Sequence, residues 1–212
     1  GIDSPVAGYM MAKRGLIVDC IHYVSPPYTS ERARMKVEAL CEKLTDWCGN
    51  IVFYCVPFTE LQEALRDNCP EELFTVLMRR LMVKIANRIC AANDYGAIIT
   101  GESVAQVASQ TLPAIFCTNA AAEYPVFRPV IGMDKREIVD VARHIDTFEV
   151  STLPYEDCCT VFSPKHPKTR PSLEEILAAE ASFDFEPLIE KAVRETEVKQ
   201  FKYGVRNVDL DM

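Results

Sequence analysis

The first residues of the chain are of types that can hold a phosphate group. Gly1, Asp3 and Ser4 come directly before a short apolar segment that begins at Val6 and has the pattern of a helix. Glycine lets a ligand approach the backbone closely, and the N–H groups and dipole at a helix start favour a negative charge. An Asp-Ser pair before a helix is also an ordinary N-cap. This stretch alone therefore fits either an anion site or a plain helix cap.

A second group of polar residues follows the short apolar segment 97–100. Gly101 opens the group, and Gln106 and Gln110 follow on a run of small residues. A glycine at the end of a strand lets a nucleotide lie flat against the backbone. An ordinary strand-to-helix turn has the same composition, so the local pattern leaves both interpretations open.

Two basic residues occupy positions where a cation could meet a phosphate. Arg79 lies off the apolar stripe of a predicted long helix, and Lys135 follows Asp134 at a predicted helix start. A solvated basic face is the ordinary explanation for such an arginine. A lysine in a first turn is mildly unfavourable, because cations prefer the other end of a helix. Either side chain could instead neutralise a phosphate.

Cys158 and Cys159 are adjacent in a polar stretch interrupted by prolines, which is not a core pattern. A thiol in a loop can act as a nucleophile or carry sulfur when its thiolate is accessible. The acidic neighbours Glu156 and Asp157 disfavour a thiolate. Two inert thiols tucked under the loop are the alternative.

Four of the other cysteines have the pattern of core residues. The chain has nine cysteines and no Cys-x-x-Cys pair, which disfavours a zinc site. Cys41 and Cys48 share one helical face, and Cys20 and Cys55 lie in strand patterns, so we expect them to pack as small apolar residues. An odd number of cysteines in a domain that does not need disulfides fits a reducing cytoplasm.

Length and charge narrow the class of protein. The 212 residues, 49% of them hydrophobic, are enough for one sizeable globular domain. No apolar run approaches the roughly 18 residues that span a bilayer. The formal net charge of −8 disfavours binding of nucleic acid by bulk electrostatics. A polyanionic partner would need a local basic patch or a region outside this chain.

Apolar periodicity predicts strands that alternate with helices. The predicted strands are 16–24, 51–56, 97–100 and 124–130, and the predicted helices are 30–47, 59–66, 71–92, 134–145, 173–182 and 187–199. Ser30 and Asp134 are predicted N-caps. This order is typical of an α/β domain, with a parallel twisted sheet and helices on both faces. Ligands of such sheets bind beyond the carboxyl ends of the strands.

We divide this single domain into three parts. A core covers residues 1–153, a cysteine-bearing loop covers 154–172, and a helical tail packed on the core covers 173–212. The candidate residues follow predicted strands or begin predicted helices, so we expect them at one edge of the sheet.

Several motifs recur along nearly the whole chain in the order of one known family. They are Gly1-Ile2-Asp3-Ser4, Ser25-Pro26-Pro27, Thr100-Gly101-Glu102-Ser103, the run from Gln106 to Leu112, Arg128-Pro129, Met133-Asp134-Lys135, the run from Pro154 to Cys159, and Phe183-Asp184-Phe185. On these motifs the sequence resembles the tRNA 4-thiouridine synthetases, or tRNA sulfurtransferases. Its first four residues are similar to the end of the Ser-Gly-Gly-x-Asp-Ser loop of PP-loop ATP pyrophosphatases.

The resemblance implies a fold, an activity and partners. The fold is the adenine nucleotide α-hydrolase-like (PP-loop) fold, truncated at the N-terminus so that the first loop residues and the strand before them are missing. The enzyme adenylates uridine 8 of tRNA with ATP and Mg²⁺, and a persulfide sulfur then displaces AMP to give 4-thiouridine. A cysteine desulfurase supplies the sulfur, and tRNA binds mainly through an N-terminal region absent here. The protein is expected in the cytoplasm, without a membrane partner, and a homodimer is left open.

The resemblance also assigns roles to residues. The ATP contacts are Gly1, Asp3, Ser4, His22, Tyr23, Arg79, Gly101 and Gln110. Asp3 is expected close to Mg²⁺, and Asp3 and Lys135 are the catalytic residues of the adenylation step. Cys158 is expected to carry the persulfide, because counting without gaps from Gln110 favours it over Cys159. Cys159 stays a candidate for the carrier or for a second, resolving thiol.

Two alternatives remain beside this assignment. One is a PP-loop ATP pyrophosphatase that acts on another acceptor, and the other is an inactive nucleotide-binding module. The run from Tyr155 to Cys159 disfavours an amide-forming relative, which needs a source of ammonia rather than a thiol. A Ser-Gly-Gly segment upstream of Gly1, preceded by a strand, would favour catalysis over the inactive module.

Overall fold

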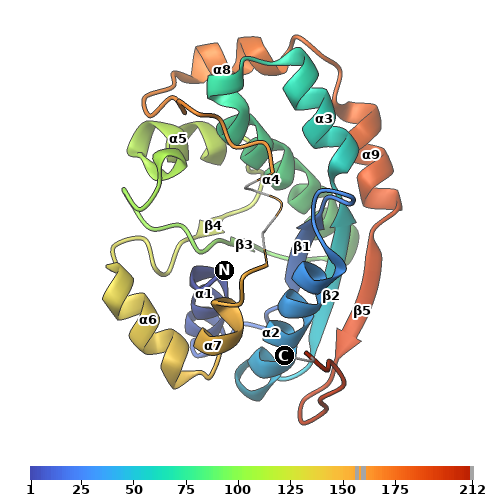
Figure 1. Ribbon diagram of the computed structural model, residues 1–212, viewed down its shortest axis with the longest axis vertical. Coiled ribbons are helices and arrows are strands. Elements are labelled where there is room, and N and C mark those ends of the chain that lie inside the picture. Colours follow the sequence, from blue (N-terminus) through green and yellow to red (C-terminus); the bar gives the residue numbers. More distant parts are fainter. Residues whose placement is uncertain (156–157, 159–160, 211–212) are drawn as a thin grey trace.

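The computed structural model describes residues 1–155, 158 and 161–210. Its main sheet has three strands in the order β1 (Cys20–Val24), β2 (Ile51–Pro57) and β5 (Glu197–Phe201). β1 and β2 are parallel, with Cys20 opposite Phe53. A separate parallel pair joins β3 (Ile98–Ile99) to β4 (Val126–Phe127). Figure 1 shows the two sheets on either side of the centre of the molecule.

Helices cover both faces of the main sheet, as predicted. The helices on one face are α1 (Asp3–Ala12), α2 (Glu31–Cys48), α6 (Lys135–His144) and α7 (Phe148–Ser151). The remaining helices are α3 (Thr59–Asn68), α4 (Phe74–Asn93), α5 (Leu112–Asn119), α8 (Leu173–Glu180) and α9 (Glu186–Arg194). Two 3₁₀ turns, η1 (Glu71–Leu73) and η2 (Ala108–Gln110), lie in the connections. Two buried clusters follow this division, one around Leu77 of α4 and one around Val6 of α1.

The C-terminal segment differs from the prediction. The helix expected to reach Lys199 ends at Arg194, and Glu197–Phe201 forms β5, antiparallel to β2. Phe201 packs edge-on against Phe53 at 5.8 Å between ring centroids. Backbone pairing with the edge of β2 and burial of Phe201 outweigh the helical pattern of the sequence. The sheet is therefore mixed, not wholly parallel.

The first strand also begins later than predicted. Leu16 to Asp19 lie outside β1, which starts at Cys20. The Asp19 carboxylate accepts hydrogen bonds from the backbone N–H of Val52 at 2.6 Å and from the Tyr95 hydroxyl at 2.6 Å. A side chain thus takes the place of a strand carbonyl at this end of the sheet.

Two predicted N-caps are confirmed. The side chain of Ser30 accepts the N–H of Ala33 at the start of α2. Asp134 forms a full capping box with Glu137 at the start of α6, which satisfies two backbone N–H groups of the first turn. Among the described residues, no helix is both long and apolar enough to cross a membrane.

Candidate nucleotide site

The amino end of α1 carries an ion pair between two predicted residues. Lys135 Nζ lies 2.9 Å from Asp3 Oδ1, although the two residues are 132 positions apart. Gln106 bridges the pair when its amide is oriented to satisfy both partners: it donates to Asp3 Oδ2 at 3.2 Å and accepts from Lys135 Nζ at 3.1 Å. Lys135 is the first residue of α6, directly after the cap Asp134.

Gly101 closes one side of this cluster. A Cβ atom at Gly101 would lie 2.8 Å from the carbonyl carbon of Asp3 and 2.8 Å from the backbone nitrogen of Ser4. Any side chain there would therefore displace the first turn of α1. The glycine is required by the close approach of two backbones, and this brings the end of β3 onto the predicted anion site.

A buried carboxylate holds two arginines next to this cluster. Glu102, with 2% of its surface exposed, accepts from Arg128 Nε at 2.7 Å and lies 3.1 Å from Arg79 Nη2. Arg79 also donates to the hydroxyl of Ser109 at 3.1 Å. Arg79 is therefore not on a freely solvated face. Glu102 fixes its guanidinium beside the segment that carries Gln110.

Gln110 is buried and has an unsatisfied oxygen. Its Oε1 has no hydrogen-bond partner among the described residues, although a buried polar atom normally has one. The backbone carbonyl of Gln110 accepts from the N–H of Ala105, so the segment itself is fixed. An oxygen held in this way can accept a hydrogen bond from a ligand.

His22 and Tyr23 do not converge on one point. They are adjacent on β1, and successive side chains of a strand point to opposite faces. The Tyr23 hydroxyl donates to the carbonyl of Met82 at 2.6 Å. The His22 ring instead stacks on the Phe53 ring, with 6.2 Å between the ring centroids. Only one of the two side chains can therefore face a given ligand.

The cysteines fall into two groups. Burial raises the pKa of Cys48 to about 12 and that of Cys55 to about 11. A hydrogen bond with Cys20, together with burial, raises the pKa of Cys41 well above its ordinary value. These thiols are inert core groups, as predicted.

Cys158 lies where the alternative of a thiol tucked under the loop expects it. It is 4% exposed, so it lies inside the molecule rather than on the surface of a loop. Its backbone carbonyl accepts from Gln62 Nε2 at 2.8 Å. Cys159 lies outside the described residues. Sequence reasoning missed Gln62 because a glutamine on an amphipathic helix is usually a solvated residue.

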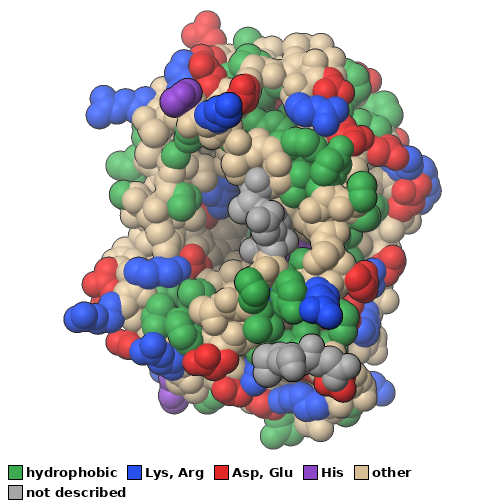
Figure 2. All heavy atoms as spheres, in the orientation of Figure 1, with side chains coloured by type: hydrophobic (Ala, Val, Ile, Leu, Met, Phe, Trp, Pro, Cys, Tyr) green, Lys and Arg blue, Asp and Glu red, His purple; other side chains and the backbone are tan. Residues whose placement is uncertain are grey.

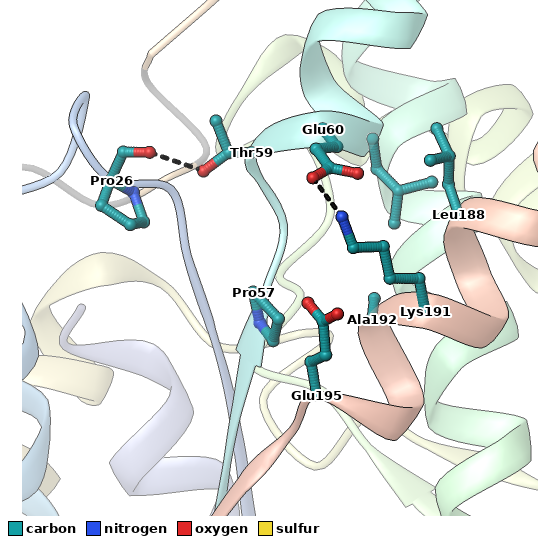
Figure 3. A pocket seen from close by; sticks show the side chains of 9 residues that line it. Pro26, Pro57, Thr59, Glu60, Leu188, Lys191, Ala192 and Glu195 are labelled. Carbon is teal, nitrogen blue, oxygen red and sulfur yellow. Dashed lines mark hydrogen bonds and ion pairs between the residues drawn. The ribbon is translucent and has the colours of Figure 1, made fainter.

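The molecule is hollowed near the amino end of α1 (Figure 1 and Figure 2). Figure 2 shows a hollow with a Lys or Arg side chain on its wall, and in the shared orientation it falls where Figure 1 marks the amino terminus. A different cavity, of about 290 Å³, lies between the end of β2, α3 and α9 (Figure 3). Lys191 and Glu60 form an ion pair at 2.5 Å in its wall. None of the residues that line this cavity belongs to the predicted site.

The fold and this site define a class of protein. The mixed α/β sheet, with ligand-type residues gathered at the amino end of α1, is the adenine nucleotide α-hydrolase-like fold of the PP-loop proteins. The chain belongs to the family described as thiamine biosynthesis protein (ThiI), whose model matches residues 1–185. The resemblance inferred from the motifs is thereby confirmed.

Individual relatives agree with this assignment. The chain is 54% identical over 198 residues to a probable tRNA sulfurtransferase of Acetivibrio thermocellus, which covers 93% of this chain and 50% of the relative. It is 53% identical over 200 residues to a probable tRNA sulfurtransferase of Alkaliphilus metalliredigens, and the match covers 94% of this chain and 51% of the relative. A crystal structure of a 4-thiouridine synthetase–RNA complex with bound ATP matches with a TM-score of 0.91 at 36% identity, over 95% of this chain and 53% of that one. The chain thus spans about half the length of these relatives.

Proposed function

We propose that this chain is the ATP-binding and sulfur-transfer region of an ATP-dependent tRNA sulfurtransferase. The enzyme adenylates uridine 8 of tRNA, releases pyrophosphate, and replaces the activated oxygen with sulfur to make 4-thiouridine and AMP. One observation carries the proposal: Asp3, Lys135 and Gly101 meet at the amino end of α1. The solved relative, a 4-thiouridine synthetase, has ATP and RNA bound.

The residues present fit ATP at two places. The first turn of α1 offers backbone N–H groups to phosphate oxygens, and Gly101 leaves the approach free of a side chain. The unsatisfied Oε1 of Gln110 fits the exocyclic amine of adenine, which is a hydrogen-bond donor. Arg79, held by Glu102, places a cation beside the segment that carries Gln110.

Asp3 is the residue we assign to Mg²⁺. Among the described residues no three His, Cys, Asp or Glu side chains gather as a metal site. Mg²⁺ commonly rests on one or two carboxylates together with phosphate oxygens and waters, so a single aspartate fits. When bound, the ion would offset the negative charge of the phosphates.

Lys135 is assigned to the charge that develops during adenylation. Its side chain is 51% exposed and reaches Asp3 without being enclosed, so it can turn from the carboxylate toward a phosphate. A preorganised cation at that point stabilises the negative charge that builds on the departing pyrophosphate. Gln106 keeps Lys135 and Asp3 aligned until then.

Cys158 is assigned to the sulfur step. Its persulfide attacks C4 of the adenylated uridine, a C–S bond forms, and the C–O bond to AMP breaks. A second thiol must then attack Cys158 Sγ, which leaves a disulfide and releases the sulfur on C4 as thiouridine. Cys159 is the candidate for that thiol, and a cellular dithiol would restore the pair.

The partners follow from the charge and the chemistry. A net charge of −8 makes this chain a poor general binder of tRNA, so we assign most of the tRNA grip to a region outside it. A cysteine desulfurase is the proposed sulfur donor. A cytoplasmic location completes the proposal.

The adenine assignment can be tested by calorimetry on the full-length protein. Wild-type protein should bind ATP more tightly than inosine triphosphate, which presents an acceptor where adenine has its amine. The Gln110→Leu variant should lose this preference while its affinity for inosine triphosphate stays within about twofold. An unchanged preference in the variant would remove Gln110 from the base site.

A further inference from the structure

A buried glutamine links the end of a strand to the backbone of Cys158. Gln62 of α3 is fully buried, and its Oε1 accepts from the hydroxyl of Ser25 at 2.5 Å. Its Nε2 donates to the carbonyl of Cys158 at 2.8 Å. Ser25 directly follows Val24, the last residue of β1. One amide therefore ties the cysteine to the carboxyl end of the sheet.

A second buried donor holds the same segment three residues earlier. Lys36 of α2 is 3% exposed, and its Nζ donates to the carbonyl of Tyr155 at 2.8 Å. A buried donor that loses its acceptor costs more free energy than an exposed one, because water does not replace the bond. Two helices thus hold the carbonyls of Tyr155 and Cys158 in one arrangement.

This arrangement keeps the Cys158 thiol away from solvent. The residue is 4% exposed, yet a thiol that exchanges sulfur with two macromolecules must contact both. Local opening of the contacts at Tyr155 and Cys158 would bring the thiol toward solvent. The free energy of that opening decides how often the thiol is accessible.

We propose that Gln62 and Lys36 are positioning residues that hold Cys158 in its buried place and set the accessibility of its thiol. They act on the backbone of the segment and not on any substrate. Loss of either donor weakens one of the two holding contacts, so the thiol becomes accessible more often. The consequence for sulfur transfer rests on the proposed function, whereas the effect on accessibility does not.

The test measures alkylation of Cys158 by iodoacetamide in the full-length protein. A Cys159→Ser background makes the modified residue unambiguous in mass spectra of the tryptic peptide. Gln62→Met nearly keeps the shape of the side chain and removes both the donor to Cys158 and the acceptor of the Ser25 hydroxyl. Lys36→Met removes the donor to Tyr155. Each should raise the rate of Cys158 modification by about five- to tenfold.

Two internal references separate local opening from unfolding. Cys117 is fully buried at another place in the core, and its modification rate reports global opening in the same digest. Glu60→Gln changes α3 at an exposed residue that pairs with Lys191 of α9. It should leave the Cys158 rate unchanged.

The modification rates of Cys158 and Cys117, compared in the same sample, either support the proposal or overturn it. Faster Cys158 modification with an unchanged Cys117 rate supports the proposal. An unchanged Cys158 rate, or equal acceleration at Cys117, overturns it, the second because Gln62 and Lys36 would then only stabilise the fold. No ATP, tRNA or sulfur donor is present, so this result does not depend on the proposed enzymatic activity.

Discussion

The Asp3–Lys135 pair joins two charges that contribute little to stability where they lie. Lys135 is half exposed, and exposed ion pairs typically contribute about 0–1 kcal/mol. The pair is nevertheless built from two distant segments and is aligned by Gln106. Because the ion pair adds little to stability, its position is better explained by a role in binding a ligand.

We therefore expect Lys135→Met to fold normally and to lose activity. The unfolding midpoint should change by less than about 2 °C, while tRNA-dependent AMP formation should fall at least about 100-fold. Lys202→Met, at another exposed lysine, is the matched control and should change neither quantity. A loss of more than a few degrees in Lys135→Met would show that the residue is structural.

Gly101→Ala should disturb the first turn of α1. The new methyl group would meet the backbone of Asp3 and Ser4 at 2.8 Å, so the free energy of unfolding should fall by about 1–3 kcal/mol. Gly132→Ala places its methyl group in open space and should cost nothing. Urea denaturation of both variants checks this, and equal stability would contradict the close contact.

The sequence predicted the residues that meet at the amino end of α1 but not those that support them. Gly101, Asp3 and Lys135 were identifiable because each lies at a predicted strand end or helix start. Glu102 was visible only as part of a motif, and its role in holding Arg79 and Arg128 appears only when β3 and α4 are brought together. Lys36 could not be recognised, because its burial depends on a segment 119 residues away.

At the scale of elements, one acidic residue joins α8 to α4. Glu180 lies 2.6 Å from Arg80 Nε and also pairs with Lys84. Arg80 in turn donates to the carbonyl of Cys117 in α5 at 2.6 Å. Burial alone would raise the pKa of Glu180, but the hydrogen bonds and charges of Arg80 and Lys84 outweigh it and lower that pKa below 4.5.

This shift predicts a pH dependence of stability. A carboxylate with a lowered pKa stabilises the fold above pH 4.5, and the contribution is lost as the pH falls through the folded-state pKa. Glu180→Gln should therefore be about 2–3 kcal/mol less stable than wild type at pH 7. The difference should shrink below pH 4.5.

Urea denaturation between pH 7 and roughly pH 3.5 measures this difference. Glu174→Gln, an exposed residue of the same helix, is the control and should follow the wild type throughout. A difference that stays constant across the range would mean that the charge of Glu180 is not what joins these helices.

Element boundaries were predictable where caps are local and not where tertiary pairing decides. Ser30 and Asp134 cap their helices through contacts three residues away. β5 is stabilised by β2, almost 150 residues earlier in the chain, and its own residues are mostly exposed. Such a strand has no strong signal of its own in the sequence.

At the scale of the molecule, the two sheets end in exposed edges. Among the described residues, β1 pairs only with β2 and β3 only with β4, and Ile21 of β1 is partly exposed. Gly101, just after β3, rests on Asp3. In a longer form of the protein, a strand that leads into Gly1 is expected to pair with the free edges of β1 and β3.

This predicts slower amide exchange when the natural upstream residues are present. The amides of Ile21, Tyr23 and Ile99 should be protected more strongly in the full-length protein than in residues 1–212 alone. The amides of β5, at the far edge of the main sheet, should change least and serve as the internal control. Equal protection at β1 and β3 in both proteins would rule out a strand at this position.

The most direct test of the central claim follows both products of the reaction at once. The full-length protein is incubated with ATP labelled at the α-phosphate, tRNA, cysteine and a cysteine desulfurase. We predict AMP that depends on tRNA, together with 4-thiouridine in that tRNA, and AMP without 4-thiouridine when Cys158 is changed to Ser. Formation of ADP, or no hydrolysis of ATP in the presence of tRNA, would contradict the account.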